Sequence, residues 1–404
     1  MLHDAPHLPP SNLSSVAHIS GRIRRGTMPP QASLDGPSRV LVISGSYGAG
    51  HDSAAREIRL RLVQAGWQVD VLDVADLFPL GFGRFLRRTY FRQLQFAPQT
   101  WAALFRALDT PEPPTTTHGT QSLVAWLPAS AVAAAVSPGT AFVVSTHPFA
   151  SQALGYLREH GMLDVPTVTY LTDASVHPMW IHPFIDIHVA VDREAARQAI
   201  LRGARDVRVI RPLTPDVPAS TGDERRTFRT QIGVAMHSPI ALISGGSGGA
   251  GDIRASARDV RDTGVAIPVV LCGRNVRLRR TLDREPGIVT VGWLDGLTTA
   301  IRGSDCVVQN AGGFTAWEAL ALGTPLISYR CLPGHGEESA KALEAEGLAP
   351  WPRSLLELDE ALSTAVHATG GEPPRTWQGR PSVMDALPLR PRRQDAAAQL
   401  QAVS

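Results

Sequence analysis

A strand, a glycine-rich loop and a helix follow one another directly near the start of the sequence. The run Val40–Ser44 is aliphatic and β-branched, which is typical of a strand buried in a parallel sheet. A loop with Gly45, Gly48 and Gly50 follows it, and a helical pattern begins at about Asp52. In such a unit, backbone N–H groups approach a ligand at the carboxyl edge of an α/β sheet. We therefore predict an α/β fold with a binding site at this edge.

His51 stands where this loop passes into the helix, so it faces whatever occupies the sheet edge. Because imidazole titrates near neutral pH, a histidine at this point is a candidate general base. The alternative is that the loop only packs the strand against the helix, with His51 as an ordinary residue of the first turn. These residues alone leave both interpretations open.

The same alternation of strands and helices continues along the chain and then starts again. With 404 residues, the chain exceeds the roughly 250–300 at which a single core stops growing, so we expect two domains. Aliphatic runs separated by amphipathic stretches predict a doubly wound parallel sheet in each. The strands expected in the first are Val40–Ser44, Gln68–Val74, Ala141–Ser145, Thr167–Thr172, Ile187–Val191 and Val207–Ile210. Those of the second are Pro239–Ser244, Ile267–Cys272, Ile288–Val291, Cys306–Gln309 and Leu326–Tyr329.

Composition marks the ends of these domains. The segment Arg211–Pro218 carries three prolines and reads as a linker. The first 38 residues are rich in Pro, Ser and His and lack the apolar segment of a signal peptide. We therefore expect a disordered extension over 1–38, an N-domain over 39–212, a C-domain over 213–370 and a tail over 371–404.

Charge and composition exclude several classes of protein. The net charge of +2 is too small to indicate a nucleic-acid partner. Lys341 is the only lysine, which excludes a Walker-type phosphate loop and Schiff-base chemistry. No run of about 18 apolar residues indicates a membrane-spanning helix. The three cysteines lie in or beside aliphatic runs, as buried thiols of a cytosolic protein do.

Three loops in the second domain are candidates for phosphate or sugar binding. Gly245–Gly251 can wrap a pyrophosphate with backbone donors, although a loop that only packs is the alternative. In Asn310–Glu318, two glycines follow a strand and Thr315 is placed to cap a helix. Glu318 then either completes a capping box or holds ribose hydroxyls. Pro333–Glu338 places two carboxylates, Glu337 and Glu338, near the start of another helix, where solvated glutamates are the alternative.

Two segments of the first domain also lie just past strand ends. They are Thr146–Pro148 and Thr172–Trp180, and the second contains Asp173 and His177. Asp173 is placed to orient or charge-stabilise a nearby histidine. A metal site is disfavoured because ligands at useful helical or hairpin spacing are absent, so we predict none.

Five of these segments, in this order, resemble a known group of enzymes. The markers are Gly48–His51, Thr172–Trp180, Cys272–Asn275, Asn310–Leu320 and Pro333–Glu338. Over about residues 39–368 the chain resembles the GT-B glycosyltransferases of family 28 that include monogalactosyldiacylglycerol synthase and processive diacylglycerol glucosyltransferase, and more distantly MurG. It departs from their glycine loop, because Tyr47 and Ala49 interrupt the run of glycines.

The resemblance implies two Rossmann-like, doubly wound domains facing a cleft, with the acceptor in the N-domain and a nucleotide sugar in the C-domain. By motif position, the catalytic residues would be His51 as the base, with Asp173 and His177 beside it. The residues that would bind the donor are Gly246, Ser247, Gly248, Gly273, Arg274, Gly312, Gly313, Thr315, Glu318, Glu337 and Glu338. The implied reaction is UDP-sugar-dependent transfer of a hexose or N-acetylhexosamine to a hydroxyl acceptor such as diacylglycerol, with inversion and without metal or cofactor.

The segment Arg84–Leu108 bears on the acceptor and on location. It is basic, aromatic and amphipathic, and helices of this kind can lie in an anionic membrane interface. A core-packing helix with solvated arginines is the alternative. The acceptor or membrane residues expected here are Arg87, Arg88, Tyr90, Phe91 and Trp101. We therefore expect a cytoplasmic enzyme, peripheral on the inner face of the cell membrane.

Two other functions fit the same expected fold. One is a UDP-N-acetylglucosamine 2-epimerase-like enzyme, which the amphipathic segment disfavours. The other is a non-catalytic nucleotide-sugar sensor, which His51 and Asp173 disfavour.

Overall fold

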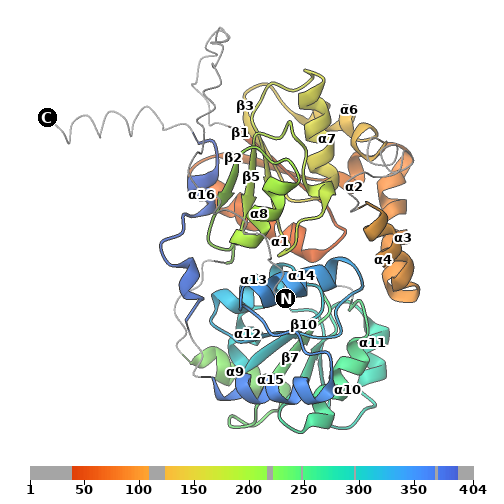
Figure 1. Ribbon diagram of the computed structural model, residues 1–404, viewed down its shortest axis with the longest axis vertical. Helices are drawn as coiled ribbons and strands as arrows, with labels where there is room; N and C mark the ends of the chain where they lie inside the picture. Colours follow the sequence, from red (N-terminus) through yellow and green to blue (C-terminus); the bar gives the residue numbers. More distant parts are fainter. Residues whose placement is uncertain are drawn as a thin grey trace, which may run out of the picture. The chain divides into compact units, whose positions relative to one another are not determined.

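The computed structural model describes residues 39–108, 123–215, 222–246, 249–294, 297–368 and 372–389. These residues belong to one compact unit, which is built on two sheets of parallel strands (Figure 1). The expected N-terminal extension lies outside the described residues, as do Ser247, Gly248 and the last part of the expected tail.

The first sheet, with its helices, forms the N-terminal half. Its strands pair in the order β2-β1-β3-β4-β5-β6. They are β1 (Arg39–Ser44), β2 (Gln68–Asp73), β3 (Thr140–Ser145), β4 (Thr167–Tyr170), β5 (Ile187–Ala190) and β6 (Val207–Val209). The α-helices are α1 (Ala49–Gln64), α2 (Val74–Leu77), α3 (Phe82–Phe96), α4 (Pro98–Leu108), α6 (Ala129–Ala135), α7 (Pro148–Glu159) and α8 (Arg193–Leu201), with 3-10 turns η1 (Pro79–Gly81) and η2 (Pro178–Trp180).

The second sheet and its helices form the C-terminal half. Its strands pair in the order β11-β10-β7-β8-β9. They are β7 (Ile240–Ser244), β8 (Ile267–Leu271), β9 (Val289–Val291), β10 (Cys306–Gln309) and β11 (Leu326–Ser328). The helices are α9 (Asp223–Ile232), α10 (Ile253–Thr263), α11 (Val276–Leu282), α12 (Thr298–Gly303), α13 (Phe314–Ala321), α14 (His335–Ala345) and α15 (Leu355–His367), followed by η3 (Arg375–Trp377) and α16 (Val383–Ala386).

Alternating side chains of each central strand enter two different hydrophobic cores. In β1, Val40 and Val42 join the core that contains Ile58 of α1, whereas Leu41 and Ile43 join the core on the opposite face. The same alternation divides β7 between the faces of its sheet. Since both faces are covered, these strands read as continuous aliphatic runs in the sequence. The doubly wound fold and the strands predicted from the sequence are confirmed, with ends that differ by one or two residues.

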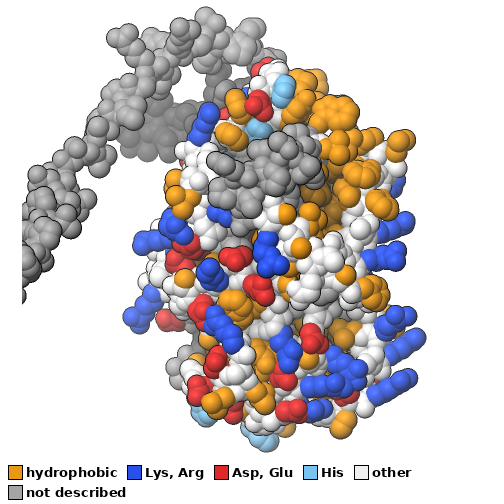
Figure 2. All heavy atoms as spheres, turned by 45° about the vertical axis from the view of Figure 1, so that its right-hand side comes forward, with side chains coloured by type: hydrophobic (Ala, Val, Ile, Leu, Met, Phe, Trp, Pro, Cys, Tyr) orange, Lys and Arg blue, Asp and Glu red, His pale blue; other side chains and the backbone are white. Residues whose placement is uncertain are grey.

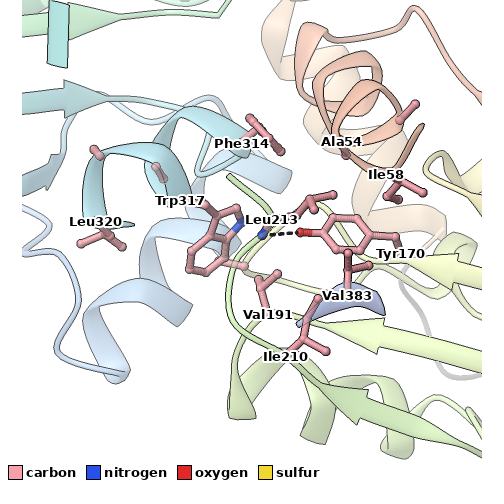
Figure 3. Close-up of a cluster of buried hydrophobic side chains, with 14 of the residues drawn as sticks. Ala54, Ile58, Tyr170, Val191, Ile210, Leu213, Phe314, Trp317, Leu320 and Val383 are labelled. Atoms are coloured by element: carbon pink, nitrogen blue, oxygen red, sulfur yellow. Dashed lines mark hydrogen bonds between the residues drawn. The ribbon is translucent and has the colours of Figure 1, made fainter. Parts of the chain in front are cut away.

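One core cluster takes residues from both halves (Figure 3). Tyr170 of β4 and Ile58 of α1 lie in it together with Trp317 of α13. The hydroxyl of Tyr170 accepts a hydrogen bond from the Leu213 backbone N–H at 3.3 Å, in the segment that leads out of the first half. The two halves are therefore packed against each other through apolar contacts as well as polar ones.

The C-terminal segment differs from the tail expected from residue 371 onward. Trp377, Val383, Ala386 and Leu387 are buried in the same shared core. The backbone of this segment also bonds the N-terminal half, because Pro381 O accepts from Arg211 N at 3.0 Å. Residues 375–389 are thus folded, since their few apolar side chains complete a core built by distant residues.

Candidate functional site

The strand order reverses once in each sheet. The reversal falls between β1 and β3 in the first sheet and between β7 and β10 in the second. Open α/β sheets bind ligands at the carboxyl edge of such a point, because the adjoining loops part there. The loops at these two points are Gly45–Gly48 with Thr146–His147, and Gly245–Asp252 with Asn310–Gly313. Gly246, Gly312 and Gly313 of the predicted donor residues lie in these loops, and His51 and Thr315 follow them in α1 and α13.

His51 lies in the first turn of α1, and its neighbours determine where its ring proton resides. The helix begins at Ala49, earlier than expected, so His51 is inside the helix rather than at its border. Its Nδ1 lies 2.8 Å from the carbonyl oxygen of Thr146. Because a carbonyl only accepts hydrogen bonds, Nδ1 carries the proton and the lone pair of the neutral ring is on Nε2.

A second partner of the same nitrogen leads to a carboxylate. Thr172 Oγ1 lies 3.3 Å from His51 Nδ1 and donates to Asp173 Oδ1 at 3.4 Å. His51, Thr172 and Asp173 thus form a hydrogen-bond series: His51 Nδ1–H donates to the Thr172 hydroxyl, which donates to the Asp173 carboxylate. An imidazolium at His51 would be stabilised by a carbonyl on one side and, through Thr172, by the carboxylate of Asp173. The sequence predicted Asp173 here but gave Thr172 no role.

His147 is a histidine of the site to which the sequence gave no definite role. Its ring packs against that of His51, with 4.7 Å between the centroids, and its Nδ1 accepts from the backbone N–H of Phe149 at 3.2 Å. Burial lowers the pKa of His147 well below 6.5, and the nearby His51 lowers it further. His147 is therefore a neutral imidazole that packs against the ring of His51. Its place just past the end of β3 is the signal that indicates it.

Gly45 leaves the room that the His147 ring occupies. A Cβ at this position would lie 2.4 Å from Cγ and 2.5 Å from Cδ2 of His147. We predict that Gly45→Ala lowers the free energy of unfolding by about 1–3 kcal/mol, because the ring and the loop must move apart. Urea unfolding measures this. Gly48→Ala is the matched control, since its Cβ would lie no closer than 3.6 Å to any atom and its φ of −172° suits any residue. Equal losses in the two variants would contradict the prediction.

His335, the first residue of α14, brings the C-terminal half to this histidine cluster. Its Nδ1 accepts from Trp101 Nε1 of α4 at 3.2 Å. Burial lowers the pKa of His335, while the carboxylate of Asp173 opposes this and His51 adds to it. The neutral ring therefore carries its proton on Nε2 and stands among groups from both halves. Only its neighbours Glu337 and Glu338 received roles from the sequence.

His177 is held differently from His51. Its Nδ1 accepts from Met179 N at 3.2 Å, and its Nε2 donates to the carbonyl of Phe105 at 3.1 Å. Its ring also packs against Phe105, with 4.2 Å between the centroids and 41° between the ring planes. Both ring nitrogens are engaged with the backbone, so the arrangement favours support of the α4 segment. Its catalytic role stays a prediction.

The glycine loop after β7 packs closely on the segment after β10. A Cβ on Gly251, whose φ is +82°, would lie 2.6 Å from Asn310 Nδ2. That nitrogen donates to Ala250 O at 2.8 Å, so Asn310 ties the two loops together. Gly246 has a φ of +69°, which favours glycine. On the next loop, Gly273 has a φ of +54° and precedes Arg274, whose guanidinium lies over the Trp293 ring at 4.3 Å from its centroid.

The start of α13 corrects the expected capping. The helix begins at Phe314 with Gly313 as its N-cap and no side-chain cap, so Thr315 is inside the helix and does not cap it. Before it, Gln309 Oε1 accepts from Ala311 N at 2.7 Å and from Gly312 N. Orphan N–H groups at such an uncapped helix start suit an anion. A Cβ on Gly313 would lie 3.7 Å from Asp173 Oδ1, so this helix start adjoins the catalytic candidates.

Glu318 of α13 is a buried carboxyl group. Only 7% of it is exposed, and burial raises its pKa to about 7, with Arg56 opposing this and Glu57 adding to it. Arg56 and Glu57 belong to α1, so Glu318 is covered by the opposite half. With no side-chain cap on α13, the capping-box alternative is wrong. Its contact with ribose stays a prediction and requires that α1 uncover the carboxylate.

The raised pKa of Glu318 predicts a pH-dependent stability. Its ordinary value is 4.5, so between about pH 4.5 and 7 the folded chain holds a proton that the unfolded chain has lost. The stability contributed by this group is complete below pH 4.5 and is lost as the pH rises through 7. Asp192, whose pKa burial also raises to about 7, acts in the same direction.

We predict that Glu318→Gln makes the fall in unfolding free energy between pH 5 and 7.5 smaller by about 1–3 kcal/mol. Urea titrations at the two pH values measure the fall. Glu360→Gln, at an exposed position of α15, is the control and should leave it unchanged. If the fall is as large in the Glu318 variant as in the parent chain, the Glu318 carboxyl does not take up a proton on folding.

Glu337 and Glu338 lie in the first turn of α14, and both are exposed. Glu337 Oε2 accepts from Gly334 N at 3.3 Å, a local contact at the start of the helix. Both carboxylates still project from the element that carries His335. Their proposed contact with sugar hydroxyls stays a prediction.

The segment 84–108 folds as α3 and α4, and its residues divide into two groups. Tyr90 and Trp101 are half-buried and pack edge to face, with 4.8 Å between centroids, and Phe91 packs against Tyr90. Arg87 turns inward to Ser46 and Asp73, whereas Arg88 is exposed. The aromatic part of the segment thus supports the candidate site through Trp101 and His335. Contact of these five residues with an acceptor or a membrane stays a prediction.

The exposed residues of the same region include several large apolar side chains. Figure 2 brings forward the side of the molecule that carries α3 and α4, and hydrophobic side chains gather on the upper part of this face. The exposed hydrophobic residues of the region are Leu80, Phe85, Phe96, Leu104, Leu123 and Trp126. Across the described ranges, the helices are all too short or too polar to cross a bilayer.

The described part of the chain contains no group of three or more His, Cys, Asp or Glu side chains arranged to hold a metal ion. His51, His147 and His335 are instead engaged with backbone or aromatic partners.

Comparison with known proteins supports the resemblance expected from the sequence. The family model described as monogalactosyldiacylglycerol (MGDG) synthase matches residues 51–211. The chloroplast MGDG synthase of Spinacia oleracea is 24% identical over 81% of this chain and 66% of its own length. The processive diacylglycerol β-glucosyltransferase of Bacillus pumilus is 29% identical over 46% of this chain and 50% of its own length. The chain therefore spans between half and two thirds of the length of these relatives.

Solved structures bear on the fold alone. The glycosyltransferase of kitacinnamycin superposes with a TM-score of 0.53 at 14% identity, over 82% of this chain and 91% of its own. The Streptomyces glycosyltransferase SsfS6, in complex with thymidine diphosphate, gives a TM-score of 0.50 at 13% identity, over 82% and 92%. The predicted GT-B fold and the resemblance to the MGDG synthase group are confirmed.

Proposed function

We propose that this chain is a UDP-sugar-dependent hexosyltransferase that glycosylates the hydroxyl of a lipid such as diacylglycerol. The observation that carries the proposal is the fixed tautomer of His51, whose Nδ1–H is held by Thr146 O at 2.8 Å and leaves Nε2 as a base. Two relatives are a monogalactosyldiacylglycerol synthase and a diacylglycerol glucosyltransferase, which supports diacylglycerol as the class of acceptor.

In the proposed reaction, the acceptor oxygen attacks the anomeric carbon while His51 Nε2 takes the hydroxyl proton. The bond from that carbon to the diphosphate oxygen breaks, and UDP leaves with its electron pair. Attack opposite the leaving group inverts the anomeric configuration. The resulting imidazolium is stabilised by Thr146 O directly and by Asp173 through Thr172.

The donor is proposed to lie against the second switch point. Gly246 to Gly248 and the start of α13 at Gly312, Gly313 and Thr315 supply backbone donors to the pyrophosphate. Gly273 and Arg274 flank the nucleotide, while Glu318 takes the ribose hydroxyls and Glu337 and Glu338 the sugar hydroxyls. In this arrangement helix starts carry the charge of the leaving group, so we propose that transfer needs no metal ion.

We propose that the chain works at a membrane surface from the cytoplasmic side. The exposed residues Phe85, Phe96 and Leu104 lie on the same two helices as the exposed Arg84, Arg88 and Arg92. Apolar and basic side chains on one element favour an anionic interface. His177 and Trp101 are then the residues that hold these helices against the site.

The donor and the need for a metal are tested together. Protection against thermal unfolding by UDP-glucose, UDP-galactose and UDP-N-acetylglucosamine identifies the donor. Diacylglycerol vesicles are then added with that donor, and the product is examined by mass spectrometry and anomeric NMR, with and without EDTA. We expect one glycolipid whose anomeric configuration is opposite to that of the donor, formed at equal rates with and without EDTA. Loss of product in EDTA would contradict the metal-free mechanism. Donor turnover without a glycolipid would contradict the proposal that the chain is a transferase.

A further inference from the structure

Trp317 links α13, the helix that follows the proposed donor loop Asn310–Gly313, to the turn that contains Thr172 and Asp173. It is a residue of α13, and only 1% of its surface is exposed. Its indole Nε1 donates to the carbonyl oxygen of Thr172 at 2.9 Å, across 145 positions of sequence. Figure 3 shows the ring in the core shared by the two halves, directed from α13 toward Val191 and Ile210.

Thr172 is bonded on both of its polar ends. Its carbonyl accepts from Trp317, and its hydroxyl stands between His51 Nδ1 at 3.3 Å and Asp173 Oδ1 at 3.4 Å. Because the carbonyl and hydroxyl belong to one residue, a shift of the carbonyl moves the hydroxyl as well. One of the two polar contacts of His51 Nδ1, that with Thr172, is therefore linked to a bond that comes from the C-terminal half.

We propose that Trp317 is a positioning residue that fixes α13 to the Thr172–Asp173 turn and thereby holds the hydrogen-bond series that orients His51. The inference rests on the proposed function, because it assigns His51 as the base. It goes beyond that function in coupling the donor helix to the base through one side chain. A displacement of α13 by a bound nucleotide would be transmitted directly to Thr172.

The same core contains a matched control. Trp377 lies 6.2 Å from Trp317 between ring centroids and is also buried. Its Nε1 has no hydrogen-bond partner among the described residues. Trp317→Phe and Trp377→Phe therefore remove similar ring volume from one core, but only the first removes a hydrogen bond to the site.

The test measures His51 directly as well as turnover. The titration of His51 is followed by NMR of protein with ¹⁵N-labelled histidine, and its signal is assigned with His51→Asn. The titratable groups that face His51 are His147, Asp173 and His335, and they are intact in both tryptophan variants. We expect Trp317→Phe to displace the ring ¹⁵N signals of His51 from those of the parent chain and to lower turnover about tenfold, with the donor KM changed less than about twofold.

Trp377→Phe should leave the ring ¹⁵N signals of His51 in place and turnover within about twofold of the parent chain. The inference would be overturned if the two variants behaved alike. It would also be overturned if turnover in Trp317→Phe fell only with the fraction of folded protein while the His51 signals stayed unchanged. If the parent chain makes no glycolipid, the proposed function fails, whereas the NMR titration still decides whether Trp317 positions His51.

Discussion

Replacing His51 by alanine should lower the rate of sugar transfer by a factor of about 10² to 10⁴, while the donor still binds. The ring nitrogen Nε2 is the proposed acceptor of the hydroxyl proton, and the tautomer that exposes it depends on the bond from Nδ1 to Thr146 O. The donor loops lie on the C-terminal half and do not include His51. Initial rates with donor and diacylglycerol vesicles, and protection of thermal unfolding by the donor, measure the two effects.

A second substitution separates the base from its structural role. His51→Asn places an amide near Nδ1 that can still donate to Thr146 O, but it has no basic Nε2. We expect it to be as inactive as the alanine variant and closer to the parent chain in stability. His237→Ala, at an exposed position of the C-terminal half, is the control for loss of a histidine. Activity within about tenfold of the parent chain in His51→Asn would remove His51 as the base.

Replacing Arg229 by alanine should lower the free energy of unfolding by about 3–5 kcal/mol. Its side chain is fully buried and pairs with Asp305 Oδ2 at 2.7 Å. It also donates to the carbonyls of Gly303 at 3.0 Å and Ser238 at 2.6 Å. Removing the guanidinium leaves the two carbonyls without this donor and takes one charged partner from the Asp305 carboxylate, which keeps Arg225 and Ile240 N as donors.

The control for Arg229 lies on the same helix. Arg226 pairs with Asp223 at 3.2 Å, but both side chains are more than two thirds exposed. Arg226→Ala should change the free energy of unfolding by less than about 1 kcal/mol. Urea unfolding of the two variants at one pH compares them, with intrinsic fluorescence as the signal. A loss in Arg229→Ala no larger than in the control would show that Asp305 is satisfied by Arg225 and Ile240 alone.

Sequence reasoning was most successful where the signal is local. The aliphatic runs of β1 and β7 and the glycines behind them predicted both sheets and the glycine loop that follows the first strand of each, since strand length and turn residues are encoded in a few adjacent positions. His51 and Asp173 were found in the same way, because each directly follows such a turn or strand.

The rest of the site depends on contacts between distant residues. The bond from Trp317 to Thr172 and that from Trp101 to His335 join the two halves, and no spacing in the sequence indicates either partner. The start of α13 was misplaced because Gly313 serves as its N-cap without a side chain, whereas Thr315 has the usual capping chemistry. The segment around Trp377 and Val383 was taken as a tail because its apolar residues are too few to show a period.

The central claim is transfer from a nucleotide sugar to a lipid hydroxyl, and acceptor-dependent release of UDP tests it most directly. The release of UDP from the protecting UDP-sugar is followed as diacylglycerol vesicles are added, and glycolipid is counted in the same samples. The account predicts that UDP and glycolipid appear in equal amounts and only when both substrates are present. UDP or an epimerised sugar formed without vesicles, or donor binding with no turnover in their presence, would contradict it.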